Sequence, residues 1–158
     1  MRKHLTLITA GILLFANSCN TVQNTNNNNN NTSQQNTMPE NIVLGKKWKL
    51  IELNGKPVAD KVNGKEPYLK LLKQDKEYRY EASGGCNGIG GNLKLTGFRV
   101  QFAQGMSTMM ACEDMSIEQG LSKALITADN YTVSKEGDVL SINKARMAPL
   151  ARFRAVAE

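Results

Sequence analysis

The chain has 158 residues, of which 41% are apolar, and its 20 Lys and Arg outnumber its 14 Asp and Glu to give a formal net charge of +6. This length suits one ordinary domain with a real core and leaves too little chain for a second. The basic residues are scattered rather than clustered, so we predict no nucleic-acid binding despite an isoelectric point near 9.3.

Residues 1–18 have the pattern of a secretory signal peptide. Arg2, Lys3 and His4 precede an apolar run over 5–16, which is too short for a membrane span of about 20 residues. Removal of this segment lowers the formal charge from +6 to +4 and takes away the only histidine. The exported chain then lacks the side chain that enzymes use most often as a general base or metal ligand.

Cys19 directly follows Ser18, which resembles the processing site of bacterial lipoproteins, where the cysteine is lipidated and becomes the first residue. Ordinary secretion is the alternative, because Ala16-Asn17-Ser18 also resembles a small-x-small cleavage site. Lipidation predicts an anchor in the outer membrane, with the protein facing the periplasm of the cell envelope. Residues 19–42 then form a disordered Asn-rich tether with a reach of about 25 Å.

From residue 43 to residue 158 the sequence has the short alternating pattern of β-strands with one buried face. Predicted strands are 47–53, 68–72, 77–82, 93–95, 98–102, 131–135, 139–142 and 151–156. The turn residues between them tolerate positive φ and are Asn54-Gly55, Asn63-Gly64, Thr96-Gly97 and Glu136-Gly137-Asp138. Among the inward-facing residues we expect Trp48, Leu50, Leu69, Leu71, Tyr78, Tyr80, Phe98, Val100 and Phe102.

One segment, residues 116–128, has helical periodicity, with Leu121 and Leu125 on its apolar face. Ser116 and Gln119 have the spacing of a capping box at its start. Gly120 inside the segment costs about 1 kcal/mol relative to alanine, so the helix must depend on packing. About eight strands and one helix predict a mainly β domain (α+β), either a small antiparallel eight-stranded barrel or a strongly curved sheet.

The stretch GGCNGIGGN, residues 84–92, concentrates five glycines around one cysteine. It lacks the third glycine of a dinucleotide-binding loop and the lysine of a P-loop, and a strand pattern follows it instead of a helix. Glycines within a strand pattern indicate a bend or the close approach of another segment.

Cys86 lies in that bend, and Cys112 is the only other cysteine of the domain. An oxidising compartment favours a disulfide between them, which would contribute up to about 3.5 kcal/mol by closing the loop. The alternative is two buried free thiols. Four methionines surround Cys112 in the sequence and suit a Cu(I) site as an alternative: Met106, Met109, Met110 and Met115. We favour the interpretation that these methionines fill core space. We therefore predict no metal and no cofactor.

Together, Gly85-Cys86-Asn87 with Gly88 and Gly91, followed by Ser107-Thr108-Met109-Met110-Ala111-Cys112 before a helix, resemble the motifs of the META domain family, the HslJ-like envelope lipoproteins of bacteria. The resemblance covers about residues 43–156. It implies a compact β-rich domain with a packed helix and a role in stress or antibiotic resistance. It implies no catalytic residues.

We therefore expect a non-enzymatic, monomeric envelope protein that binds an unidentified envelope protein or surface component. The alternative is a carrier that holds a small ligand in an apolar cavity lined by Tyr78, Tyr80, Phe98 and Phe102, although these aromatics suit a plain core equally well. A serine hydrolase is disfavoured, because the exported chain has serines but no histidine to activate one.

Overall fold

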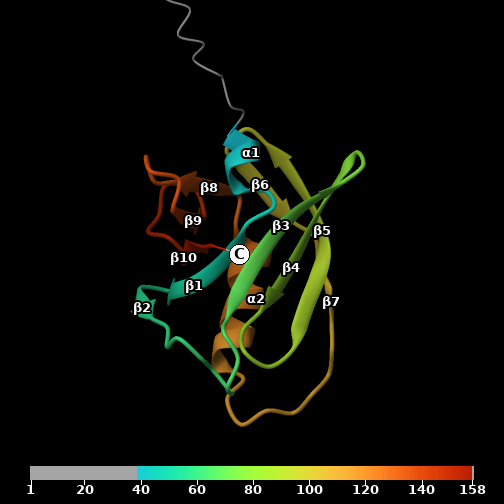
Figure 1. Ribbon diagram of the computed structural model, residues 1–158, viewed down its shortest axis with the longest axis vertical. Helices are drawn as coiled ribbons and strands as arrows, with labels where there is room; N and C mark the ends of the chain where they lie inside the picture. Colours follow the sequence, from blue (N-terminus) through green and yellow to red (C-terminus); the bar gives the residue numbers. More distant parts are fainter. Residues whose placement is uncertain (1–38, 158) are drawn as a thin grey trace, which may run out of the picture. The chain divides into compact units, whose positions relative to one another are not determined.

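The computed structural model describes residues 39–157; the predicted signal peptide, Cys19 and nearly all of the predicted tether lie outside them. Two helices and ten strands follow one another along this part of the chain (Figure 1). Their bounds are α1 (Pro39–Val43), β1 (Lys47–Leu53), β2 (Lys56–Pro57), β3 (Tyr68–Gln74), β4 (Glu77–Ser83), β5 (Gly88–Thr96), β6 (Arg99–Phe102), β7 (Met106–Ser107), α2 (Ser116–Thr127), β8 (Asn130–Val133), β9 (Val139–Asn143) and β10 (Ala151–Val156).

The strands form a closed antiparallel barrel, which confirms the predicted fold. Around the barrel the order is β1, β3, β4, β5, β6, β8, β9 and β10, and the pairing of β10 with β1 completes the circle. Two short strands lie outside this circle: β2 pairs with β1, and β7 pairs with β5. Closure leaves no long unpaired edge among the eight barrel strands.

The predicted turns have the expected backbone. Asn54, Asn63, Gly97 and Gly137 all have positive φ, at 51°, 50°, 59° and 76°. Asp75 also has positive φ, at 54°, in the tight connection from β3 to β4, where the sequence shows no glycine.

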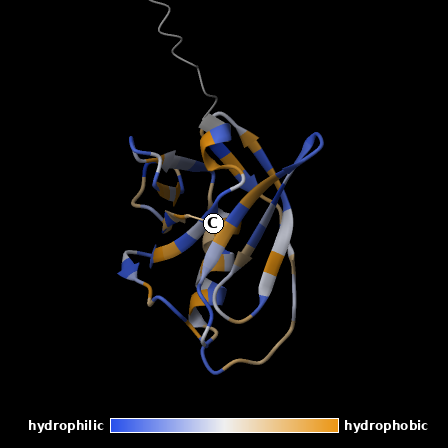
Figure 2. Cartoon of the chain, in the orientation of Figure 1, coloured by the Kyte–Doolittle hydropathy of each residue, from blue (hydrophilic) through white to orange (hydrophobic). Residues whose placement is uncertain are grey.

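Side chains fill the inside of the barrel in the alternation that the sequence predicts. Figure 2 shows hydrophilic and hydrophobic residues in turn along the strands. Trp48 and Phe153 are fully buried, and the rings of Tyr80 and Phe102 meet edge to face at 5.1 Å. These buried side chains form a packed core. Of the four aromatics predicted for a carrier cavity, Tyr78 and Phe102 line an open cleft of about 560 Å³ beside β5 and β6.

The prediction that Phe98 faces the core is wrong, because 57% of its surface is exposed. It lies in the turn before β6, outside the ladder, and its ring tilts against Tyr131 at a centroid distance of 5.9 Å.

The helix α2 has the predicted position, and Leu121, Ala124 and Leu125 are buried on its inner face. The predicted capping box is wrong. Met115 occupies the N-cap without a side-chain bond, and Asp114 Oδ1 instead accepts the Ser116 N–H at 2.8 Å. A Cβ on Gly120 would lie 2.8 Å from Leu53 Cδ2, so this glycine allows the helix to approach β1 closely. Among residues 39–157, neither helix has the length and hydropathy that a bilayer span requires.

Candidate functional site

Three loops from distant parts of the chain meet at one end of the barrel, beside the start of α2. They are residues 58–67 before β3, residues 84–87 between β4 and β5, and residues 108–115 between β7 and α2, and Figure 1 shows all three near the lower end of the view. They contain the cysteines and most of the motif residues singled out in the sequence.

Two glycines of the middle loop are required by close packing. A Cβ on Gly84 would lie 2.2 Å from Glu118 Cα, so the first turn of α2 rests directly on the loop backbone. Gly85 has a φ of +108°, and a Cβ there would lie 2.6 Å from atoms of Val62 in the first loop. The sequence-based expectation of a close backbone approach is therefore confirmed at these two positions.

Cys86 and Cys112 form the predicted disulfide, with their Cα atoms 6.1 Å apart. Cys86 is buried, whereas Cys112 is partly exposed. The bridge ties the loop 84–87 to the segment 108–115 just before α2.

The side-chain amide of Asn87 is a second tie between the same two segments. Its Oδ1 accepts the backbone N–H of Met110 at 2.7 Å, and its Nδ2 donates to the Met110 carbonyl at 3.1 Å. Asn87 thus pairs with Met110 as a neighbouring strand would. Thr108 Oγ1 also donates to Asn87 Oδ1 at 2.9 Å.

Glu118 completes the cluster from the helix side. Its buried carboxylate accepts hydrogen bonds from the backbone N–H of Asn87 and, at 2.9 Å, from Asn87 Nδ2. Burial of a carboxylate is unfavourable unless donors replace water, and Asn87 supplies both. Glu118 is not among the residues predicted from the sequence. The available signal was an acidic residue three positions before Leu121, on the edge of the apolar helix face.

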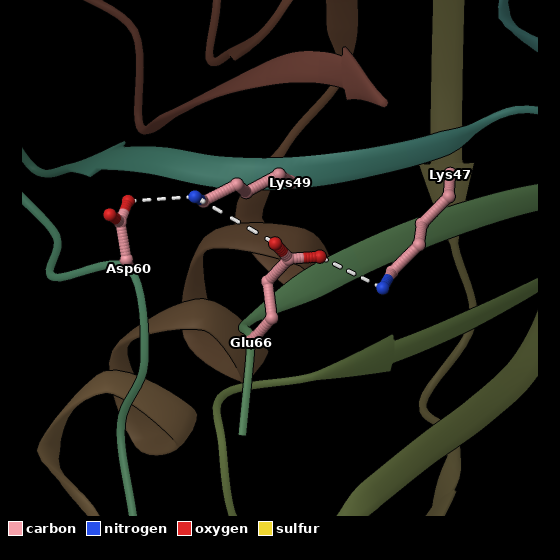
Figure 3. A network of polar contacts seen from close by, with 4 residues as sticks. All are labelled: Lys47, Lys49, Asp60 and Glu66. Atoms are coloured by element: carbon pink, nitrogen blue, oxygen red, sulfur yellow. Dashed lines mark hydrogen bonds and ion pairs between the residues drawn. The ribbon is translucent and has the colours of Figure 1, made fainter. Parts of the chain in front are cut away.

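Ion pairs hold the first loop against β1 (Figure 3). Lys49 Nζ lies 2.7 Å from Asp60 Oδ1, and Lys47 Nζ lies 2.8 Å from Glu66 Oε1. The hydrogen bond from Lys49 holds the pKa of Asp60 below its ordinary value, and the hydrogen bond from Lys47 does the same for the pKa of Glu66. Both carboxylates are therefore in their charged form at neutral pH.

The same loop also reaches the other two segments. Asn63 Nδ2 donates to the Asp114 carbonyl at 2.6 Å, and Asn63 Oδ1 accepts the Asp114 N–H at 3.1 Å. Lys65 Nζ donates to the Cys86 carbonyl at 3.2 Å. The disulfide and the side-chain amides of Asn63 and Asn87 therefore tie the three loops into one assembly.

The side chains of Met106, Met109 and Met110 point outward from this assembly. Met106 is 82% exposed and Met109 is 98% exposed, and Met110 and Ser107 are exposed as well. The expectation that methionines fill core space is wrong for Met106, Met109 and Met110, because β7 is only two residues long and leaves Met109 outside any ladder, whereas Met115 is half-buried. The copper alternative would also need the two cysteine thiolates, and both cysteine sulfurs are in the bridge.

Gly88 and Gly91 of the motif lie in β5 with their Cα atoms on opposite faces of the sheet. Gly91 is on the inner face, where a Cβ would lie 2.9 Å from the Tyr80 ring. Gly88 is on the outer face, with no atom within 4 Å of the Cβ position. The motif therefore mixes packing positions with a surface position.

Chemically, the buried groups of this end bind one another. Both cysteine sulfurs are in the bridge, and Glu118 and Asn87 satisfy each other. What remains available to another molecule is the outer surface of the assembly, above all its thioethers.

Comparisons with known proteins place the domain. Residues 40–157 match the family model described as META domain. No curated protein matches the chain. An NMR structure of a protein from Burkholderia xenovorans has a TM-score of 0.59 and 19% identity, covering 75% of this chain and 86% of that one. A second NMR structure has a TM-score of 0.56 and 18% identity, covering 73% of this chain and 92% of the other. These likenesses show the fold alone, whereas the family model spans the whole described domain, and the chain therefore belongs to the META domain family.

Proposed function

We propose that this protein is a non-enzymatic binding module of the bacterial cell envelope, an HslJ-like lipoprotein anchored through Cys19 to the periplasmic side of the outer membrane. As a monomer it holds a partner protein on the surface of residues 106–110, which we call the methionine surface. By holding that partner it supports resistance to stress or antibiotics.

The observation that supports this proposal best is that the methionine surface is apolar and exposed and that its backbone is held in place. Thioether side chains adapt to many apolar partners, and Met106 and Met109 are almost wholly exposed. The backbone of Met106 pairs with Gly90 of β5, and the chain after Met109 is held by Asn87 at Met110 and by the Cys86–Cys112 bridge. A rigid segment loses little conformational entropy on binding, so its apolar contacts contribute more fully to affinity.

Photo-crosslinking in living cells tests the proposal. The full chain carries a photoreactive methionine analogue at Met109 or, as a matched control, at Met147, which is 69% exposed in the loop between β9 and β10. We expect a discrete adduct with a partner protein from Met109 and none from Met147.

A second arm replaces Met106, Met109 and Met110 with serine and follows survival under heat and antibiotic stress. Because these side chains lie on the surface, the variant should fold normally and yet lose protection. The proposal fails if Met109 and Met147 give the same adducts, or if the triple variant protects as well as the natural chain.

A further inference from the structure

Two glycines on the outer face of β5 have no structural reason to be glycine. Gly88 and Gly90 do not have positive φ. A Cβ on Gly88 would meet nothing within 4 Å, and one on Gly90 would make only an ordinary contact, 3.5 Å from the Tyr80 carbonyl. Glycine weakens a strand, and where packing does not require it, it often marks a place that a ligand or another backbone approaches closely.

These glycines form the floor of an open groove of about 360 Å³ on the outside of the barrel. Gly90 lies between Glu81 of β4 and Met106 of β7 in the strand register. Leu72 and Arg79 line one side of the groove, and Met106 and Thr108 line the other. The groove is thus continuous with the methionine surface, because Met106 belongs to both.

Two charged residues, Arg79 and Glu81, line the groove. Glu81 lies directly opposite Lys70 of β3, and opposite charges in such cross-strand pairs offset each other. Arg79 lies between Leu72 and Asn92, neither of which is charged. Arg79 is therefore the lining charge that has no opposite charge directly across the strands.

We infer that the groove binds an acidic segment of a partner protein through one aromatic side chain. A flat floor of peptide backbone accepts a ring. The Met106 thioether and the Arg79 guanidinium are the two side chains that interact most favourably with aromatic rings. A carboxylate beside the ring complements the positive charge of Arg79. This inference rests on the proposed function and specifies the chemistry of the partner.

Titration with four dipeptide amides tests the ring and the charge separately. The probes are N-acetylated Trp-Glu, Leu-Glu, Trp-Lys and Leu-Lys, added to the ¹⁵N-labelled exported chain with Cys19→Ser, which removes the predicted lipidation site. We expect Trp-Glu to shift the backbone amides of Gly88, Gly90 and Met106. Leu-Glu and Trp-Lys should each bind about fivefold more weakly, the ratio expected for one lost cation–π or charge contact.

Gly90→Val and its control Asn92→Val test whether the dipeptides bind in the groove, and Arg79→Gln tests the role of the positive charge. Gly90→Val fills the floor and should abolish the shifts, whereas Asn92→Val, on the same face of β5 but outside the groove, should keep them. Arg79→Gln should remove the preference for Trp-Glu over Trp-Lys and weaken the preference over Leu-Glu, because the Met106 thioether still contacts the ring. All three changes are on the outer surface, so dispersed amide spectra are expected throughout.

Equal binding of the four dipeptides, shifts elsewhere on the domain, or full binding to Gly90→Val would overturn the inference. The proposed function has its own readout, the Met109 adduct in cells. An adduct that persists in Gly90→Val without dipeptide selectivity leaves the proposed function standing and removes the groove. Selective dipeptide binding without any Met109 adduct leaves the groove as a binding site and removes the proposed function.

Discussion

Gly84 lies in the loop before β5 and Gly88 is the first residue of β5, and the two have opposite steric surroundings. The Cβ position of Gly84 coincides with the backbone of Glu118, whereas the Cβ position of Gly88 is in open space. The sequence motif treats them alike. Only the position of α2, which begins at Ser116, makes one indispensable for packing and leaves the other free.

Replacement of each glycine by alanine should separate these roles. Gly84→Ala should lower the free energy of unfolding by about 3 kcal/mol or more, because the added methyl group meets backbone that cannot rotate away. Gly88→Ala should leave it unchanged or raise it by up to about 1 kcal/mol, through the lower entropy of the unfolded chain. Urea denaturation measures both, and equal effects would contradict the packing described here.

Asn87 and Glu118 show what residue-level patterns miss. Asparagine after a glycine-rich stretch predicts a turn residue, yet Asn87 binds Met110 through both ends of its amide and meets Glu118 on α2. The pair is 31 positions apart in sequence. No local spacing rule connects residues at that separation, so this contact could not be predicted.

Three ties hold the segment 108–115, which presents Met109 and Met110 of the methionine surface. They are the bridge from Cys112 to Cys86, the hydrogen bonding of Met110 and Thr108 to Asn87, and the two hydrogen bonds between Asn63 and Asp114. Loss of one tie should therefore loosen the segment without releasing it.

Reduction of the bridge tests this redundancy. With a sequence separation of 26, the closed loop contributes up to about 3.5 kcal/mol to the free energy of unfolding. We expect a reductant to lower the thermal midpoint of the natural chain and not that of Cys86→Ala/Cys112→Ala. The amide of Met110 should stay protected from hydrogen exchange in the reduced protein, and its loss of protection would show that Asn87 is no independent tie.

Acid should release the loop 58–67 from β1. The pKa values of Asp60 and Glu66 are lowered in the folded state, so their contribution is present above their unfolded pKa, about 4, and is lost as the pH falls through the folded pKa values. Hydrogen exchange in the loop should accelerate below about pH 4, after correction for the intrinsic rate. Lys47→Gln/Lys49→Gln removes the cause of both shifts and should exchange faster already at pH 6; a pH response identical to that of the natural chain would rule out the ion pairs as its source.

At the scale of the whole molecule, the first and last strands of the barrel pair with each other. β1 and β10 match from Lys47↔Val156 to Leu53↔Ala151. Phe153 is fully buried in the shared core. The fold is thus complete only when the end of the described chain has been added to its beginning, a long-range contact that slows folding.

Deletion of residues 151–158 should abolish cooperative unfolding. It removes the strand that closes the barrel, opens the edges of β1 and β9, and exposes the core beside Phe153. Deletion of residues 157–158 keeps every pair of the β1–β10 ladder and serves as the control. A sharp thermal transition in the longer deletion would show that closure is dispensable.

The sequence left open whether the barrel closes and whether Cys86 and Cys112 pair, and the structure decided both. By itself the sequence determined the number and alternation of the barrel strands, the position of α2 and the turns with positive φ. These depend on local periodicity and on residue types with strong conformational preferences. It did not determine the two-residue strands β2 and β7, which are too short to have a period. Nor did it determine which methionines are exposed or that Glu118 meets Asn87. Those features follow from how the barrel brings distant loops together, and only the tertiary structure decided them, because contacts between segments tens of residues apart leave no periodic trace in the sequence.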